Sequence, residues 1–299
     1  MSAADYRPTD QLHLWLLTVP ADPVLIGELN LVRANRGVSL RYADAWLERG
    51  FALSEDLPLV DEEFLPPDKE TAAGAVDDAR PDRWGERLIR FLDKPARLSL
   101  LEYLYFAGDD RFGALGVSTS ATEYRPRRFG PLPVLGDAVR IQELIRRLQD
   151  GETVRDRERV LLAPGATMGG ARPKALLDID AEQWVVKFGD GDATDAPLVE
   201  HAAMTLASQA GIRVAETMPV RLTGGHAVAV KRSDRKRAGR VHCLTAHVAL
   251  RPAHERFGYP ELAQLLRRRG VTAGDRYVAD MHELFRRMVF NILIDNTDD

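Results

Sequence analysis

Residues 162–188 constrain the fold of this chain more than any other stretch. Glycines and alanines at positions 165–171 are followed by two short, largely apolar runs, Ala175–Asp180 and Trp184–Phe188. Both runs are partly β-branched and a polar turn separates them, which predicts a β-hairpin. A loop of small residues lets backbone N–H groups approach a phosphate, and Lys187 on the second strand can reach the same phosphates. The stretch predicts a nucleotide cradle; a glycine-rich turn beside a solvated lysine is the alternative.

The chain after this hairpin carries further parts in the order that a protein-kinase site needs. A helix is predicted at 198–210, strands at 215–222 and 227–230, and a long helix at 275–294. No GxxxxGK[ST] pattern occurs, so the cradle is typical of protein kinases rather than of Walker-type NTPases. On the long helix, apolar residues at a spacing of three and four, Ile292 among them, predict a buried stripe.

Five residues would carry the chemistry of such a site. Lys187 would orient the phosphates, and Glu200 would pair with Lys187 from the following helix. Val228 and Val230 would line the adenine pocket, and Asp298 would accept the proton of the attacking hydroxyl. Each charged residue has a plain alternative. Lys187 could be a surface lysine, and Glu200 a carboxylate that stabilises the first turn of its helix. Asp298 could be a solvated loop carboxylate.

Composition sets the broad class. The 299 residues are 45% apolar and 29% charged, as in ordinary globular proteins of one or two domains. The net charge of −4 gives no global argument for binding nucleic acid. The single cysteine, Cys243, excludes an intramolecular disulfide and fits a reducing cytosol. The polar N-terminus and the lack of an apolar run of about 18 residues predict a cytoplasmic protein with no signal peptide and no membrane partner.

The first half of the chain reads as a separate unit. Alternating residues between 12 and 60 predict several strands, and apolar spacing predicts helices at 86–92 and 99–106. The proline- and arginine-rich segment 121–135 looks like a linker. We therefore predict an N-terminal subdomain over residues 1–135 and a second unit over residues 136–299.

Two other constellations are weaker. His242, Cys243 and His247 lack the paired spacing of a structural zinc site, and no metal ligand is assigned in this chain. The charged run Lys231–Arg237 is interpreted as a solvated hairpin tip. A surface that grips an acidic substrate or nucleic acid is the alternative for this run.

Taken together, these residues resemble the HipA-like serine/threonine kinases, the toxins of bacterial type II toxin–antitoxin systems. The similarity covers nearly the whole chain, and the ordered set of motifs is far more specific than any one of them. The matching segments are, in chain order, Ile26–Leu29, Leu40–Tyr42 with Trp46–Leu47, Leu53–Leu59, Asp78–Gly85, Gly108–Leu115, Gly169–Leu176, Val186–Phe188, Val230–Arg235 and Asn296–Asp298.

The resemblance implies an α/β (α+β) HipA-like kinase fold. A small β-rich N-terminal subdomain would precede a kinase-like nucleotide-binding core, with the C-terminal helical lobe incomplete. ATP and Mg²⁺ would be the cofactors, and the γ-phosphoryl group would pass to a protein hydroxyl in the translation machinery, for which an aminoacyl-tRNA synthetase is the example. The implied partner is a cognate HipB-like, DNA-binding antitoxin, and DNA would be reached only through that antitoxin.

The same resemblance assigns roles to individual residues. Lys187 and Asp298 would be catalytic. The nucleotide would be bound by Lys187, Glu200, Val228 and Val230, and by the loop residues Thr167, Met168, Gly169, Gly170, Ala171, Arg172 and Lys174.

Three departures from the family pattern stand out. Ala166 and Thr167 occupy the front of the loop, where the family often has an autophosphorylated serine. Lys231 and Ser233 stand where some members have an acidic and an aromatic residue. The chain ends at Asp299, before the family's metal-binding asparagine and later aspartate, so we expect a truncated chain that transfers phosphoryl groups slowly or not at all.

Two further functions stay open on the sequence. One is a non-catalytic, kinase-like partner that sequesters an antitoxin or regulates a complete kinase. The other is a related kinase that acts on a small molecule or a lipid head group.

Overall fold

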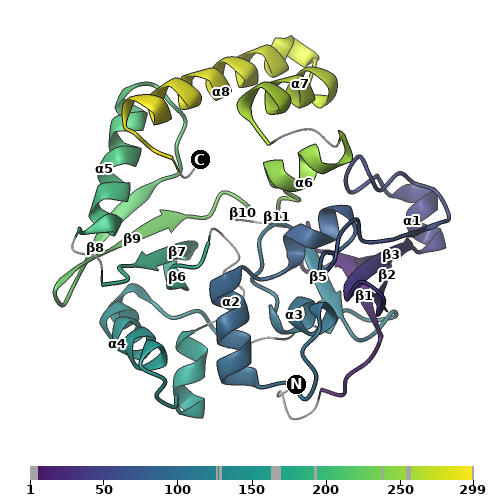
Figure 1. Ribbon diagram of the computed structural model, residues 1–299, viewed down its shortest axis with the longest axis horizontal. Coiled ribbons are helices and arrows are strands. Elements are labelled where there is room, and N and C mark those ends of the chain that lie inside the picture. Colours follow the sequence, from purple (N-terminus) through teal and green to yellow (C-terminus); the bar gives the residue numbers. More distant parts are fainter. Residues whose placement is uncertain are drawn as a thin grey trace.

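The structure, a computed structural model, describes residues 6–125, 127, 130–162, 170–191, 194–237, 239–253 and 257–297. Within these residues, a five-stranded and a four-stranded antiparallel sheet lie side by side with helices packed around them (Figure 1). The mixed α/β class predicted from the sequence is confirmed.

The first sheet has the strand order β4-β3-β2-β1-β5. Its strands alternate apolar and polar residues, so side chains such as Leu12, Leu14, Leu29 and Leu40 point to one buried face. The elements of this part are β1 (Gln11–Leu16), β2 (Val24–Val32), β3 (Gly37–Tyr42), α1 (Asp44–Arg49), β4 (Glu63–Phe64), the 3₁₀ helix η2 (Gly74–Ala79), α2 (Arg83–Leu88), the π turn η3 (Ile89–Asp93), α3 (Leu100–Phe106) and β5 (Leu115–Ser118).

A buried arginine holds the end of this part together. Arg111 is fully buried, and its guanidinium donates to the carbonyls of Ala79, Leu104 and Gly108. These carbonyls lie at the ends of η2 and α3, where helix carbonyls lack partners within the helix and favour a cation. Arg111 therefore ties two helix ends to the turn that leads into β5.

The second sheet has the order β6-β7-β9-β8, and helix α4 covers one of its faces. The elements are the 3₁₀ turn η4 (Leu135–Asp137), α4 (Ala138–Gln149), the 3₁₀ helix η5 (Asp156–Leu161), β6 (Lys174–Ile179), β7 (Glu182–Phe188), β8 (Thr217–Leu222) and β9 (Gly225–Lys231). Trp84 and Leu88 of α2 belong to the core beneath this sheet. Helix α2 thus comes from the first half of the sequence but packs against the second sheet, and it lies between the two sheets in Figure 1.

The remaining helices come from about the last third of the chain, and the first of them packs against β8 and β9. They are α5 (Ala196–Gln209), α6 (Ala246–Leu250), the 3₁₀ turn η6 (Arg251–Ala253), α7 (Tyr259–Arg269), the 3₁₀ turn η7 (Ala273–Asp275) and α8 (Arg276–Leu293), and a small ribbon, β10 (Arg235–Lys236) with β11 (Gly239–Arg240), precedes α6. No helix of the described residues is long and apolar enough to cross a membrane.

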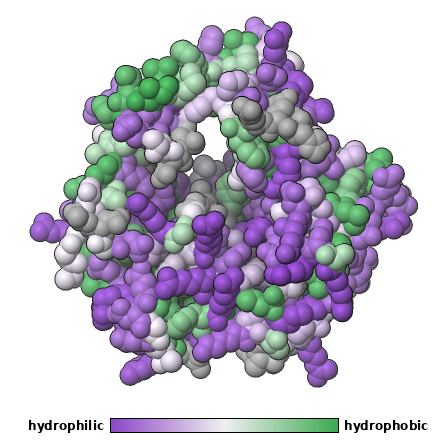
Figure 2. All heavy atoms as spheres, in the orientation of Figure 1, coloured by the Kyte–Doolittle hydropathy of each residue, from purple (hydrophilic) through white to green (hydrophobic). Residues whose placement is uncertain are grey.

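The long C-terminal helix was predicted correctly, but its predicted buried stripe is only partly covered: Tyr277, Met281, Leu284 and Met288 are half-buried. Phe285, Val289 and Ile292 are exposed in α8, and the buried residue is Glu283, which accepts from the backbone N–H of Arg213. Hydrophobic residues accordingly gather on the surface over α8 in Figure 2. The 3.6-residue periodicity fixes the helix, whereas burial depends on what packs against it.

Candidate functional site

The candidate site lies on the face of the four-stranded sheet opposite α4. Lys174 of β6 stands opposite Lys187 of β7, and Lys187 stands opposite Val228 of β9. Residues directly opposite one another in antiparallel strands point to the same face. Val230 follows two positions after Val228 and joins them. The register thus places four of the predicted residues on one face.

Lys187 is paired as predicted. Its Nζ lies 2.6 Å from Oε1 of Glu200, which projects from α5. The lysine and glutamate side chains are 28% and 35% exposed, so the pair lies at an accessible surface. An ion pair between a strand lysine and a helix glutamate is one of the parts that an active kinase must have in place.

Polar contacts with the sheet position helix α5 so that Glu200 lies beside Lys187. Asp195 caps the helix by accepting from the backbone N–H of Leu198, and its carboxylate also contacts His226 of β9 at 2.6 Å. The His226 contact lowers the pKa of Asp195 below its ordinary value. One turn into the helix, Nδ1 of His201 lies 2.8 Å from the hydroxyl of Thr217 in β8. The contacts of Asp195 with His226 and of His201 with Thr217 thus hold the start of α5 against the sheet.

Lys174 has a different environment. Its side chain is fully buried, and its Nζ donates to Oδ2 of Asp82 at 2.5 Å and to the carbonyl of Gly170 at 2.8 Å. Burial lowers the pKa of Lys174 and raises that of Asp82, while the attraction within the pair opposes both shifts. The ammonium is engaged by protein acceptors, and the predicted contact of Lys174 with a nucleotide stays a prediction.

The small-residue loop is described from Gly170 onward. Thr167, Met168 and Gly169 lie outside the described residues, as does Asp298. Gly170, Ala171 and Arg172 are exposed, and Gly170 has a φ of +83° with no atom within 4 Å of the place a Cβ would take. This backbone conformation favours glycine, and the open space leaves room for a ligand to approach the chain.

The charged run at 231–237 differs from its prediction as a solvated tip. Arg232 and Asp234 are buried, and the Asp234 carboxylate accepts from Arg232, Arg235 and the backbone N–H of Gly113. Burial alone would raise the pKa of Asp234, but the two arginines lower it below its ordinary value. Lys236 is exposed. Two of the motifs singled out in the sequence, 108–115 and 230–235, therefore contact each other.

The residues considered for a metal do not form a cluster. His242 Nε2 lies 3.2 Å from the carbonyl of Leu53, and His247 stacks on Phe257. In the described part of the chain, no group of three histidine, cysteine, aspartate or glutamate residues could hold a metal ion.

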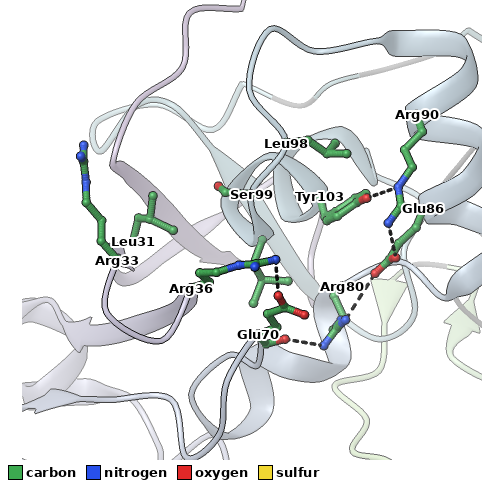
Figure 3. A pocket seen from close by; sticks show the side chains of 11 residues that line it. Leu31, Arg33, Arg36, Glu70, Arg80, Glu86, Arg90, Leu98, Ser99 and Tyr103 are labelled. Atoms are coloured by element: carbon green, nitrogen blue, oxygen red, sulfur yellow. Dashed lines mark hydrogen bonds and ion pairs between the residues drawn. The ribbon is translucent and has the colours of Figure 1, made fainter.

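Two cavities lie near α2. One, of about 380 Å³, runs along the start of α2 and is bordered by Asp82, Phe112, Gly170, Ala171 and Thr245. The other, of about 430 Å³, is lined by four arginines whose charges are largely met within the pocket (Figure 3). Its internal contacts are Arg36 with Glu70, Arg80 with Glu86, and Arg90 with Glu86 and Tyr103. The first cavity is the one that adjoins the loop.

Comparison with known proteins identifies the relatives of this fold and site. The HipA N-terminal domain family matches residues 17–118, and the HipA-like C-terminal domain family matches residues 166–299. The chain belongs to the HipA-like family. The resemblance stated from the sequence motifs is thereby confirmed.

A solved structure agrees with this assignment at the level of the fold. It is HipA of Shewanella oneidensis MR-1, in a toxin–antitoxin complex with HipB and its operator DNA. That HipA aligns with a TM-score of 0.59 and 20% sequence identity, over 95% of this HipA-like chain and 70% of its own. No curated protein matches the sequence.

Proposed function

We propose that this HipA-like protein is a serine/threonine protein kinase that transfers the γ-phosphoryl group of ATP to a protein hydroxyl. The observation that carries the proposal is the partly exposed Lys187–Glu200 ion pair on the sheet face opposite α4, in a chain of the HipA-like family. Kinases need such a pair to hold the phosphates. Lys187 would orient ATP phosphates, and Val228 and Val230 would lie against its base.

The described residues fit a nucleotide better than a metal. The Lys187 ammonium is accessible, and the open backbone at Gly170 lies at the end of the loop that the sequence places over phosphates. A bound ATP supplies the phosphoryl group. The carboxylate of Asp298 would take the proton of the attacking hydroxyl. Ligands for Mg²⁺ are expected outside the described residues, so we assign none here.

The biological setting is part of the proposal. We infer a cognate HipB-like antitoxin as partner, since the HipA of similar fold forms a complex with HipB and operator DNA. DNA would be reached through that antitoxin. The protein substrate would belong to the translation machinery of the cytoplasm, with aminoacyl-tRNA synthetases as the first class to test.

The test is a phosphorylation assay on the protein produced from its natural gene. Purified aminoacyl-tRNA synthetases are incubated with ATP labelled at the γ-phosphate and with Mg²⁺, and label on serine and threonine is measured. Lys187→Ala should lower the rate by about 100-fold, because it removes a charge that stabilises the transferring group. Lys69→Ala, a change at an exposed lysine in the segment that follows β4 of the first sheet, should stay within about twofold.

Two results would overturn the proposal. No label on any protein from the wild-type enzyme would contradict the kinase assignment. An unchanged biological effect in the Lys187→Ala variant would instead favour the non-catalytic partner.

A further inference from the structure

The buried contact between Asp82 and Lys174 joins two parts of the chain that are 92 residues apart. Asp82 is the N-cap of α2, in the segment that links the first sheet to the rest. Lys174 is the first residue of β6, directly after the small-residue loop. The Asp82 side chain is 10% exposed and that of Lys174 is fully buried. The Lys174 ammonium is therefore shielded from water, and the Asp82 carboxylate is largely buried at the border of the 380 Å³ cavity.

Stability alone does not explain such a pair. Removing two charges from water is costly, and an apolar pair of similar volume is often at least as stable. What the ion pair adds is direction, because an ammonium flanked by fixed acceptors has one preferred position. A role in geometry accounts for this contact better than a role in holding the fold together.

The neighbours of Lys174 show which geometry is fixed. Its ammonium also binds the carbonyl of Gly170, four residues earlier, at 2.8 Å. Its own carbonyl accepts from the indole Nε1 of Trp84 at 2.8 Å, and Trp84 is in α2 two residues after Asp82. The end of the loop, Gly170 to Lys174, is thus held to α2 at both its side chain and its main chain.

Lys187 stands next to this arrangement. It lies opposite Lys174 in the sheet, and like charges on neighbouring strands repel each other. The carboxylate of Asp82 neutralises the charge of Lys174. Of the two opposed lysines, Lys187 is therefore the accessible cation. Both the position of the loop end and the charge beside Lys187 depend on Asp82.

We propose that Asp82 is a positioning residue of the nucleotide site: acting through Lys174, it anchors the end of the phosphate loop to helix α2 of the N-terminal part. The anchoring can be measured without any ligand. Its effect on nucleotide binding rests on the proposed kinase function.

The substitution Asp82→Asn separates this role from helix capping. Oδ1 of Asp82 accepts from the backbone N–H of Gly85, and asparagine caps helices about as well as aspartate. The variant therefore removes the charge that meets Lys174 and keeps the cap.

Asp109→Asn is the matched control. Asp109 is 14% exposed and pairs with Arg240 of β11 at 3.2 Å, so it also joins the first half of the chain to the second. Its side chain accepts from Tyr124 and from Arg240 of β11, and neither residue belongs to the loop. Both variants lose a carboxylate of similar burial between the same two parts.

Hydrogen exchange of the full chain without nucleotide is the first readout. Asp82→Asn should speed exchange in the peptide that covers Gly170–Leu176 by about tenfold, because an amide exchanges faster when the structure that holds it opens more often. Asp109→Asn should leave this peptide unchanged. Equal exchange in wild type and Asp82→Asn, or the same increase throughout the molecule, would overturn the proposal.

Kinetics give the second readout. Asp82→Asn should raise KM for ATP by about tenfold and change kcat far less, because a displaced loop weakens binding of the phosphates. In a Lys174→Met background, Asp82→Asn should raise KM for ATP little further, since Asp82 acts through Lys174. Full additivity of the two changes would contradict that route.

The two readouts keep the two proposals apart. If the wild type uses no ATP, the kinase proposal fails while the exchange experiment still decides whether Asp82 anchors the loop. If ATP is used and exchange near Gly170 does not respond to Asp82→Asn, the anchor fails and the kinase proposal stands.

Discussion

The regions around Lys174 and Lys187 differ sharply although the two lysines stand opposite each other on one sheet face. Each ammonium lies close to one carboxylate, at 2.5 Å from Asp82 and 2.6 Å from Glu200. The first pair is almost fully buried between α2 and β6, whereas the second is about one-third exposed beneath α5. An exposed pair can exchange its partner for a phosphate at little cost, and a buried one cannot. Burial, rather than residue type, divides the two roles.

The largest effect that tests this contrast is on stability. Lys174→Met should lower the free energy of unfolding by about 3–5 kcal/mol, because it leaves the buried Asp82 carboxylate without its cation. Lys187→Met should cost about 1 kcal/mol or less, as for an exposed pair. Urea unfolding of the two variants measures the difference. Equal losses would contradict the division between a buried and an accessible pair.

An intermediate effect is expected on catalysis. Glu200→Gln should lower the phosphorylation rate by about tenfold, since the neutral amide holds the Lys187 ammonium less firmly than a carboxylate does. Glu216→Gln, which weakens the exposed contact between Glu216 and Lys231, is the control and should have almost no effect. A phosphorylation rate for Glu200→Gln equal to that of the wild type would contradict a role of Glu200 in catalysis.

The smallest effect extends the comparison to pH. The pKa of Asp234 lies below its ordinary value of 3.8, so its contribution to stability is present above that pH and is lost as the pH falls through the lower, folded-state pKa. The stability gap between wild type and Asp234→Asn should therefore be constant from pH 7 to about pH 5 and shrink only below 3.8. Chemical denaturation across this range measures the gap. A gap that shrinks already near pH 6 would be inconsistent with the arginine contacts of Asp234.

Local patterns predicted the elements around the site. The short β-branched runs predicted β6 and β7, and the apolar spacing over 198–210 predicted α5, which brings Glu200 to Lys187. The register of a hairpin follows from its turn and from the alternation of its side chains. The pairing of β6 with β7 could therefore be predicted from the sequence.

Contacts between segments that are far apart in the sequence could not be predicted from local patterns. Nothing at Asp82 or Lys174 alone shows that they meet, because their approach depends on how α2 packs under the second sheet. The run 231–237 was interpreted as solvated because charged side chains are usually exposed, and the acceptors that bury Arg232 lie at residues 110 and 111. The exposed face of α8 shows the same limit, since periodicity predicts a face and not what covers it.

The central claim is that Lys187, and not Lys174, meets the phosphates of ATP. An ATP analogue with an acyl group on its terminal phosphate transfers that group to a lysine amine beside the phosphates, and mass spectrometry of the digested protein locates it. The account predicts acylation of Lys187 that excess ATP prevents, with Lys174 unmodified. Acylation of Lys174 that ATP prevents, or no ATP-protected label on Lys187, would contradict it.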